Sequence, residues 1–184
     1  MRITGGAWRS RTLDAPRGTA TRPTSDRVRE ALFSMLAADG LLDVDVVLDL
    51  YAGSGALAFE ALSRGVSEAV LVEHARDALA AIRQNARALG AEGRIRVIAS
   101  KVDRALGSDA AQYGLVLVDP PYADVRAPAF GATFAAMAAR VAPGGALVLE
   151  HASADDPPPS ASLTLDRSRR YGDTTLSLYR KPEP

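Results

Sequence analysis

Four consecutive residues, Asp119-Pro120-Pro121-Tyr122, follow the apolar run 115–118 and combine a carboxylate, a stiff turn and an aromatic ring. Proline fixes φ and lacks an amide donor, so two in succession stiffen the turn and leave carbonyl oxygens as acceptors. The exocyclic amine of a base is a poor nucleophile, because its lone pair is delocalised into the ring. Binding that amine between the Asp119 carboxylate and the Pro120 carbonyl would favour electron density on nitrogen, while the base stacks on Tyr122, a contact worth about 1–3 kcal/mol. The pattern indicates group transfer to an amino nitrogen; the simpler interpretation is a strand-ending turn.

A glycine-rich turn precedes this run by about 65 residues. The strand pattern 46–50 leads into the turn and a helical pattern begins at Ala56, an order in which backbone approaches a ligand closely above the carboxyl end of a strand. Glycines are needed there if a side chain would collide with the ligand or if φ is positive. The spacing Gly53-x-Gly55-x-x-Ala58 also fits a dinucleotide fingerprint. The predicted cofactor contacts in the turn are Tyr51, Ala52, Gly53, Ser54 and Gly55.

Glu73 ends the next predicted strand, about 20 residues after Gly53, where an acidic residue binds the two hydroxyls of a ribose. This position serves NAD and S-adenosylmethionine alike. His74 could flank an adenine, and Lys101 with Val102 follows the third strand, where the adenine would lie. A dehydrogenase needs a proton donor near the nicotinamide, and the fourth strand ends instead in the Asp119 tetrapeptide. S-adenosylmethionine is therefore the predicted cofactor, and Asp119 is also among its predicted contacts.

Composition limits the other classes of function. The chain has 184 residues, 47% hydrophobic content and no net charge, which suits one well-buried domain. It has no cysteine and only two histidines, so disulfides, thiolate sites and a histidine-rich metal cluster are not expected, and no metal is predicted. No charge-free apolar stretch of ~18 residues and no export signal is present, so the prediction is a cytoplasmic protein without a membrane partner.

The first thirty residues have a net charge of about +4, and the rest of the chain has a net charge of about −4. A basic segment rich in arginine suits bidentate contacts with phosphates of a nucleic acid. The alternative is that an arginine-rich chain uses Arg where others use Lys, since it has only two lysines. The arginines are Arg2, Arg9, Arg11, Arg17, Arg22, Arg27 and Arg29, and the acids are Asp14, Asp26 and Glu30.

Apolar periodicity predicts an α/β fold: a single doubly wound, Rossmann-like domain over 21–184, preceded by a basic arm or short β-hairpin over 1–20. Its sheet is predicted to be mostly parallel and seven-stranded, closed by an antiparallel strand at the C-terminus. Helices are expected at 26–38, 56–64, 76–89 and 127–141. Strands are expected at 44–50, 69–73, 95–99, 115–118 and 146–150, the last after a turn at 143–145, with two more between 163 and 179 around Tyr171-Gly172-Asp173.

Taken together, the glycine turn, Glu73 and the Asp119 tetrapeptide resemble S-adenosylmethionine-dependent amino methyltransferases. The chain as a whole resembles the RsmD family, which methylates the exocyclic N2 of a guanine in bacterial small-subunit (16S) ribosomal RNA. The tetrapeptide is shared with DNA amino methyltransferases, whereas the block 22–33 is closer to RsmD. The resemblance rests on the segments 2–6, 8–11, 22–33, 49–57, 60–65 and 171–174, so it covers nearly the whole chain. Phe59 departs from it, because a smaller residue is expected there.

This resemblance implies further roles. Arg22, Pro23 and Thr24 would border the methionine part of the cofactor and the substrate pocket, and Asp49 would lie near the cofactor's amino group. A guanine unstacked from its RNA would enter the pocket for direct in-line transfer, governed by positioning more than by a strong base. The predicted partner is 16S ribosomal RNA, within an assembled or assembling small subunit. The residues expected to contact it are Arg2, Trp8, Arg9, Arg11 and Arg27.

Several alternatives remain open at this point. Methylation of adenine N6 in DNA would usually need a larger target-recognition region than 184 residues leave. Methylation of a protein glutamine is another possibility, although that group typically carries Asn in place of Asp119. From other classes, an NAD-dependent oxidoreductase and a non-catalytic RNA-binding module remain possible.

Overall fold

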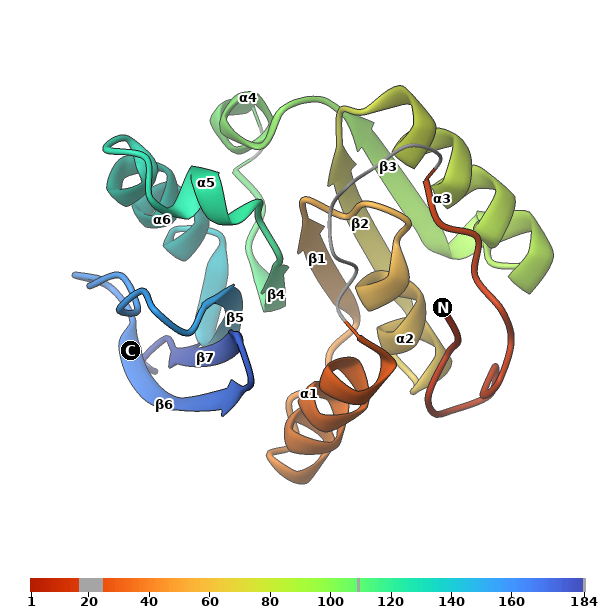
Figure 1. Cartoon of the computed structure of the whole chain (residues 1–184), viewed down its shortest axis with the longest axis horizontal. Coiled ribbons are helices and arrows are strands. Elements are labelled where there is room, and N and C mark those ends of the chain that lie inside the picture. Colours follow the sequence, from red (N-terminus) through yellow and green to blue (C-terminus); the bar gives the residue numbers. More distant parts are fainter. Residues whose placement is uncertain (17–24, 109, 184) are drawn as a thin grey trace.

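The computed structural model describes residues 1–16, 25–108 and 110–183, and a seven-stranded mixed sheet runs through its middle. The strand order is β3-β2-β1-β4-β5-β7-β6 (Figure 1). Adjacent pairs are parallel from β3 to β5, while β7 is antiparallel to both of its neighbours. The strands are β1 (Val46–Leu50), β2 (Glu68–Glu73), β3 (Ile95–Ala99), β4 (Tyr113–Val118), β5 (Val141–Ala152), β6 (Thr164–Tyr171) and β7 (Thr174–Arg180).

Helices cover both faces of this sheet. One buried cluster joins the face of the sheet under α1, α2 and α3, and a second joins the opposite face to α4 and α6. In Figure 1, α2 and α3 lie to the right of β1 and β4, and α5 and α6 lie at the upper left, above β5, β7 and β6. The helices are α1 (Asp26–Ala38), α2 (Ala56–Ser63), α3 (Arg76–Leu89), α4 (Val102–Ser108), α5 (Tyr122–Val125) and α6 (Phe130–Ala138), with a short 3₁₀ turn, η1 (Glu92–Arg94), before β3.

This architecture confirms the Rossmann-like prediction, including the antiparallel β7. Strand order reverses between β1 and β4, the place where open α/β sheets bind ligands, because connections leave the two strands in opposite directions. Some details differ from expectation. Helices α4 and α5 were not predicted, and the expected turn 143–145 lies inside β5, where Gly144 and Gly145 form backbone hydrogen bonds with Lys181, just after β7.

The predicted N-terminal β-hairpin is wrong. The segment 1–16 contains one isolated antiparallel bridge, between Arg2 and Thr12, and no strand. The physical reason is that several backbone amides that a β-ladder would need donate hydrogen bonds to residues of α2 instead. The amides of Thr4 and Gly5 donate to the Glu60 carboxylate at 2.8 and 2.9 Å, and that of Ala7 donates to the Ser63 carbonyl at 2.7 Å.

A buried cluster of charges fixes this segment between α1 and α2. The Glu60 carboxylate is fully buried and lies 3.3 Å from Nε of the buried Arg29 and 2.8 Å from Nε of Arg64. Arg29 also donates to the Arg2 carbonyl. Because an uncompensated buried charge is strongly destabilising, these partners hold one another in place, and loss of any one is expected to loosen the N-terminal segment.

Candidate functional site

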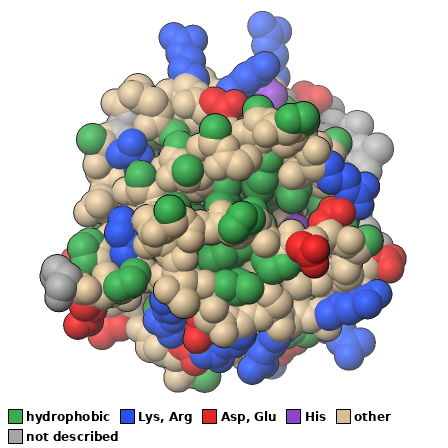
Figure 2. Space-filling view, turned by 90° about the vertical axis from the view of Figure 1, so that its left-hand side faces the viewer, with side chains coloured by type: hydrophobic (Ala, Val, Ile, Leu, Met, Phe, Trp, Pro, Cys, Tyr) green, Lys and Arg blue, Asp and Glu red, His purple; other side chains and the backbone are tan. Residues whose placement is uncertain are grey.

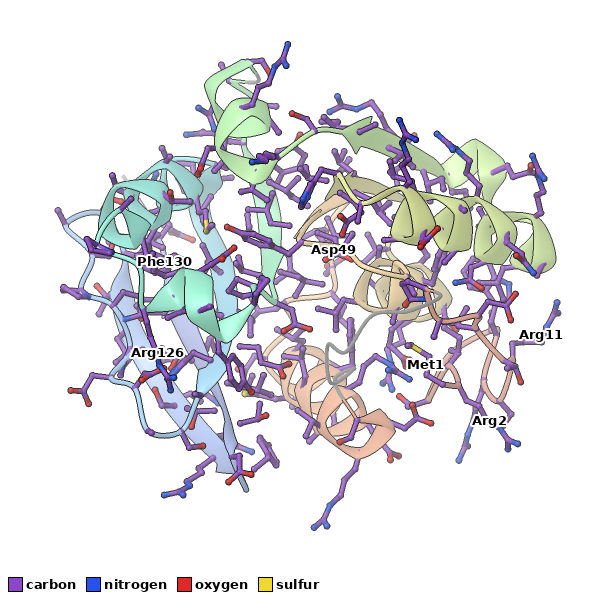
Figure 3. All side chains as sticks on the ribbon, turned by 45° about the horizontal axis from the view of Figure 1, so that its top comes forward. Met1, Arg2, Arg11, Asp49, Arg126 and Phe130 are labelled. Carbon is purple, nitrogen blue, oxygen red and sulfur yellow. The ribbon has the colours of Figure 1, made fainter. Side chains whose placement is uncertain are left out.

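The candidate site lies where four parallel strands end side by side. Leu50 is in register with Val72 of β2 and with Val118 of β4, and Glu73 is in register with Ala99 of β3. The glycine turn, the Glu73 carboxylate and the Asp119 tetrapeptide therefore share one edge of the sheet. Figure 3 shows Asp49 centrally, between the α5–α6 side marked by Arg126 and Phe130 and the N-terminal side marked by Met1.

The two glycines of the turn are required for different reasons. Gly55 has a φ of +79°, and a Cβ there would lie 2.6 Å from Cε2 of Phe59, so its absence makes room for that buried ring. Gly53 has a φ of +55°, and a Cβ there would meet nothing within 4 Å. Its backbone thus faces open space, as a turn that receives a ligand requires. Tyr51, at the strand end, also adopts a positive φ of 61°, a strained conformation found often at functional sites.

Glu73 holds the turn and the next loop together. Its Oε2 accepts the Gly53 amide at 2.9 Å, and its Oε1 accepts the amides of His74 and Ala75 at 2.7 and 2.8 Å. The side chain is only 10% exposed. Three backbone donors fix the carboxylate at the end of β2, so it is already oriented before any ligand binds.

Asp49, on β1, is fully buried. Its Oδ2 accepts the amide of Ala58 at 3.0 Å and so caps the first turn of α2, whose N-cap Gly55 has no side chain to do so. Its Oδ1 is buried with no hydrogen-bond partner in the described structure. Burial, together with the charges of Asp119 and Glu73, raises the pKa of Asp49 to about 8, although the Ala58 amide opposes the shift. An orphaned, buried carboxylate oxygen calls for a donor, which a bound ligand can supply.

The tetrapeptide continues directly from β4. The Asp119 amide donates to the Leu50 carbonyl at 3.4 Å, which ties the tetrapeptide to the end of β1. Pro120 is buried, and no hydrogen bond reaches its carbonyl within the described part of the chain, so that oxygen can accept one from a substrate. The hydroxyl of Tyr122 lies 2.8 Å from Oγ1 of Thr174, on β7. The ring of Tyr122 is therefore held at both of its ends.

The remaining predicted cofactor contacts are distributed around this edge. Ala52 and Ser54 are buried, and the Ser54 carbonyl accepts from Nδ2 of Asn85 at 3.0 Å. His74 is 59% exposed, with Nδ1 3.5 Å from the Glu73 carboxylate. Lys101 is exposed, whereas Val102 is buried at the start of α4. Arg22, Pro23 and Thr24 lie outside the described residues.

Comparisons with known proteins identify the family of this chain. The family model described as "Conserved hypothetical protein 95" matches residues 1–180. The "Putative rRNA methyltransferase YlbH" of Bacillus subtilis is 32% identical over 98% of this chain and 99% of its own length. The chain belongs to the RsmD/YlbH family. It is a methyltransferase that uses S-adenosylmethionine.

Other members of the RsmD/YlbH family support this assignment. "Ribosomal RNA small subunit methyltransferase D" of Escherichia coli is 43% identical over 66% of this chain and 60% of its own length. Among solved structures, the "Putative methyltransferase yhhF from Escherichia coli" superposes with a TM-score of 0.84 at 33% identity, covering 100% of this chain and 99% of that one. The likeness therefore extends over sequence and fold together.

The strand-end residues fit the cofactor of this family. Asp49 offers the unpartnered oxygen that an amino group would satisfy, Glu73 an oriented carboxylate for vicinal hydroxyls, and Gly53 an open backbone for close approach. The described side chains include no group of three or more His, Cys, Asp or Glu that could hold a metal ion. Within the same residues, no helix is long and apolar enough to cross a membrane.

The basic residues at the N-terminus are spread along α1, α2 and α3. Trp8 donates its amide to Ser63, at the end of α2, and its ring lies 5.3 Å below the guanidinium of Arg94, just before β3. Both contacts lie at the amino-terminal edge of the sheet, opposite Asp119. Arg11 donates to the Ala88 carbonyl, and the Arg2 amide lies 3.4 Å from Asp26. Arg9 and Arg27 are exposed. Their contact with RNA stays a prediction.

Two residues of the site were not singled out from the sequence. Thr174 lies 52 positions from Tyr122, and only its place in the segment 171–174 that resembles RsmD indicated any importance. Asn85 connects the glycine turn to the N-terminal segment, since its Nδ2 donates to the carbonyls of Ser54 and Asp14, both at 3.0 Å. The sequence signal for Asn85 was a polar residue on the otherwise apolar, buried face of α3.

Proposed function

We propose that this chain transfers a methyl group from S-adenosylmethionine to the exocyclic N2 of a guanine in small-subunit ribosomal RNA. The observation that carries the proposal is the placement of Asp119, the unbonded Pro120 carbonyl and the Tyr122 ring beside the glycine turn, at the edge where β1 and β4 end. The printed names of two relatives, an rRNA methyltransferase and a small-subunit rRNA methyltransferase, support ribosomal RNA as the substrate class.

Asp119 and the Pro120 carbonyl would each accept one N–H of the amine. These two hydrogen bonds would favour a geometry in which the nitrogen lone pair points out of the ring plane. In the planar geometry the lone pair is delocalised into the ring and the amine is unreactive. On gaining the methyl group, the amine nitrogen would lose one proton, which the Asp119 carboxylate would accept. When bound, the cofactor supplies a methyl group on a positively charged sulfur, which is a good leaving group.

The other residues position the two reactants. Tyr122 would stack on the guanine after the base is rotated out of its RNA context, a step that costs a few kcal/mol. Thr174 fixes the Tyr122 hydroxyl at 2.8 Å. Glu73 and Asp49 would hold the cofactor's hydroxyls and amino group. Because the leaving group is intrinsically good, holding nitrogen and methyl in line accounts for most of the expected rate.

Selection of the RNA would depend on charge and shape. Exposed arginines of the N-terminal segment and of α1, including Arg9 and Arg27, are proposed to contact phosphates, which fix register without reading sequence. Recognition of folded RNA depends largely on its shape. We therefore propose that an assembled or assembling small subunit is the substrate, because proteins hold the RNA in one shape there.

The test is transfer of labelled methyl from S-adenosylmethionine to small ribosomal subunits that lack their native methylations. Naked 16S RNA, DNA and ribosomal proteins serve as competing acceptors. Label recovered as N2-methylguanosine after nucleoside digestion is the expected result. Label found in N6-methyladenosine or in protein would keep the fold and the cofactor and overturn the substrate.

A further inference from the structure

We propose that the exposed end of the β6–β7 hairpin is a second RNA-binding surface, in which Arg169 and Arg170 bind backbone phosphates of the substrate beside the Asp119 tetrapeptide. The inference rests on the proposed function, because it needs an RNA substrate. It adds to the basic N-terminal segment a surface that belongs to the opposite end of the chain.

The hairpin end is joined to the tetrapeptide by a direct contact. Tyr171 and Thr174 are the last pair of the β6–β7 ladder, and Oγ1 of Thr174 lies 2.8 Å from the hydroxyl of Tyr122. Arg170 and Arg169 precede Tyr171 on β6. At about 3.3 Å per residue, both arginines lie within about 7 Å along the strand from Tyr171, whose ladder partner Thr174 contacts Tyr122.

The guanidinium groups of these two arginines are available to a partner. Both residues are exposed, and β6 is the edge strand of the sheet. No ion pair or side-chain hydrogen bond of Arg169 occurs within the described structure, and Arg170 uses Nε for the Gly172 carbonyl at 2.9 Å. Arg167, by contrast, is paired with Asp39 at 3.3 Å and with Asp166 at 2.9 Å. Within the described structure, the arginines of β6 nearest the site, Arg169 and Arg170, are therefore not paired with an acidic side chain, whereas Arg167, farther from the site, is.

The two side chains lie on opposite faces of the sheet. Arg169 pairs with Leu176, whose side chain belongs to the core under α1, and Arg170 pairs with Thr175, on the other face. A polyanion that crosses the strand edge could therefore meet a guanidinium on either side. Figure 2 views the molecule from its β6 side, and Lys and Arg side chains, with Asp and Glu among them, lie along the lower part of that view as well as at its top and sides.

A different explanation for these charges is protection of the edge strand. Charged side chains on an exposed edge prevent pairing with another chain, and for that purpose either sign is sufficient. Phosphate binding requires positive charge. Reversal of charge therefore separates the two explanations, because glutamate keeps the protection and removes the attraction.

The experiment uses full-length protein carrying Arg169→Glu and Arg170→Glu, with Arg83→Glu and Arg87→Glu on the exposed side of α3 as the matched control. Affinity for small subunits that lack their native methylations is measured at several salt concentrations. Loss of two phosphate contacts should lower affinity at least about tenfold and reduce the slope of log affinity against log salt by about 1 to 2. S-adenosylmethionine affinity should not change, and the control should keep the wild-type slope.

Unchanged affinity and slope in the Arg169/Arg170 variant, while the wild type methylates guanine, would overturn the second surface and leave the proposed function intact. Wild-type protein that neither binds nor methylates RNA would overturn both. If the glutamate variant aggregates, Arg169→Gln with Arg170→Gln takes its place, and wild-type binding by that variant would equally refute the surface.

Discussion

The ends of β1 and β4 are neighbours in the sheet but are built in different ways. At β1, two buried carboxylates hold the backbone: Glu73 accepts the Gly53 amide of the turn and two amides of the loop after β2, and Asp49 caps α2. At β4, two prolines stiffen the tetrapeptide, the Asp119 amide donates to the Leu50 carbonyl, and the Tyr122 hydroxyl contacts Thr174. The first region is oriented mainly by buried carboxylates, and the second by the stiff turn and by contacts with β1 and β7.

This difference matches two tasks. A cofactor that must be held in one bound geometry is bound well by groups oriented in advance, because little ordering of the protein remains to be done on binding. A nucleobase that must enter from a large RNA needs an open edge with a few well-placed acceptors. If the two regions are independent in this way, substitutions at the end of β4 should lower the rate of methyl transfer without weakening cofactor binding. Substitutions at the end of β1 should change the region that binds the cofactor.

The largest effect is expected for Asp119→Ala. Loss of the carboxylate that accepts the amine should lower the rate of transfer at least about 100-fold, comparable to removal of one preorganised catalytic hydrogen bond. Affinity for S-adenosylmethionine, measured by calorimetry, should stay within a few-fold of wild type. Asp124→Ala, an exposed acid on α5, is the control. An active Asp119→Ala enzyme would show that the amine is bound elsewhere.

A smaller effect is expected from breaking the contact between Tyr122 and Thr174. Tyr122→Phe and Thr174→Val each remove the hydrogen bond, worth about 1 kcal/mol, so each should raise KM for the subunit several-fold. Because the two residues act through one contact, the double variant should be no worse than either single one, and Thr174→Ser should restore activity. Additive losses in this double-mutant cycle would mean that Thr174 does not position the ring.

The smallest effect on catalysis is expected at Asp49, where the predicted change is in stability as a function of pH. Burial raises the pKa of this carboxyl from 3.8 to about 8, so between these values the folded protein keeps a proton that the unfolded chain releases. Wild-type stability without cofactor should therefore fall as pH rises through this window and level off above it.

Asn at position 49 cannot ionise, so Asp49→Asn should lose this part of the pH dependence. Its melting temperature should exceed that of wild type by an amount that grows from pH 5 to pH 8. Thermal melts of both proteins across this range provide the measurement. Parallel curves would show that Asp49 titrates near its ordinary value and that the charge is compensated in the folded state.

Several elements followed from local pattern alone. Ser25 precedes the apolar periodicity of α1 and accepts the amide of Val28, so this helix begins where a capping residue predicts. Helix α3 and strand β3 also have the predicted bounds. Helix α4 was missed because it has only seven residues and few of them are apolar, which leaves little periodicity to detect.

The N-terminal segment shows why the remainder could not be predicted. Its glycines and alternating residues favour a hairpin locally, yet its amides donate to Glu60 and Ser63, more than fifty residues away in the chain. Glu60 itself reads as a surface residue of a helix but is fully buried with Arg29. Such pairings depend on which helix packs against which, and no local pattern encodes that choice.

The sequence by itself determined the strand-turn-helix order at Gly53, the acid at Glu73 and the stiff acceptor turn at Asp119, because glycine, proline and alternating apolar residues act on the nearby backbone. Only the tertiary structure decided that Tyr122 meets Thr174, that Asp49 is buried with an oxygen lacking a partner among the described residues, and that Arg169 and Arg170 precede the strand pair that includes Thr174. The physical reason is that burial and long-range contact are properties of the packed sheet, where the order of the strands brings distant residues together.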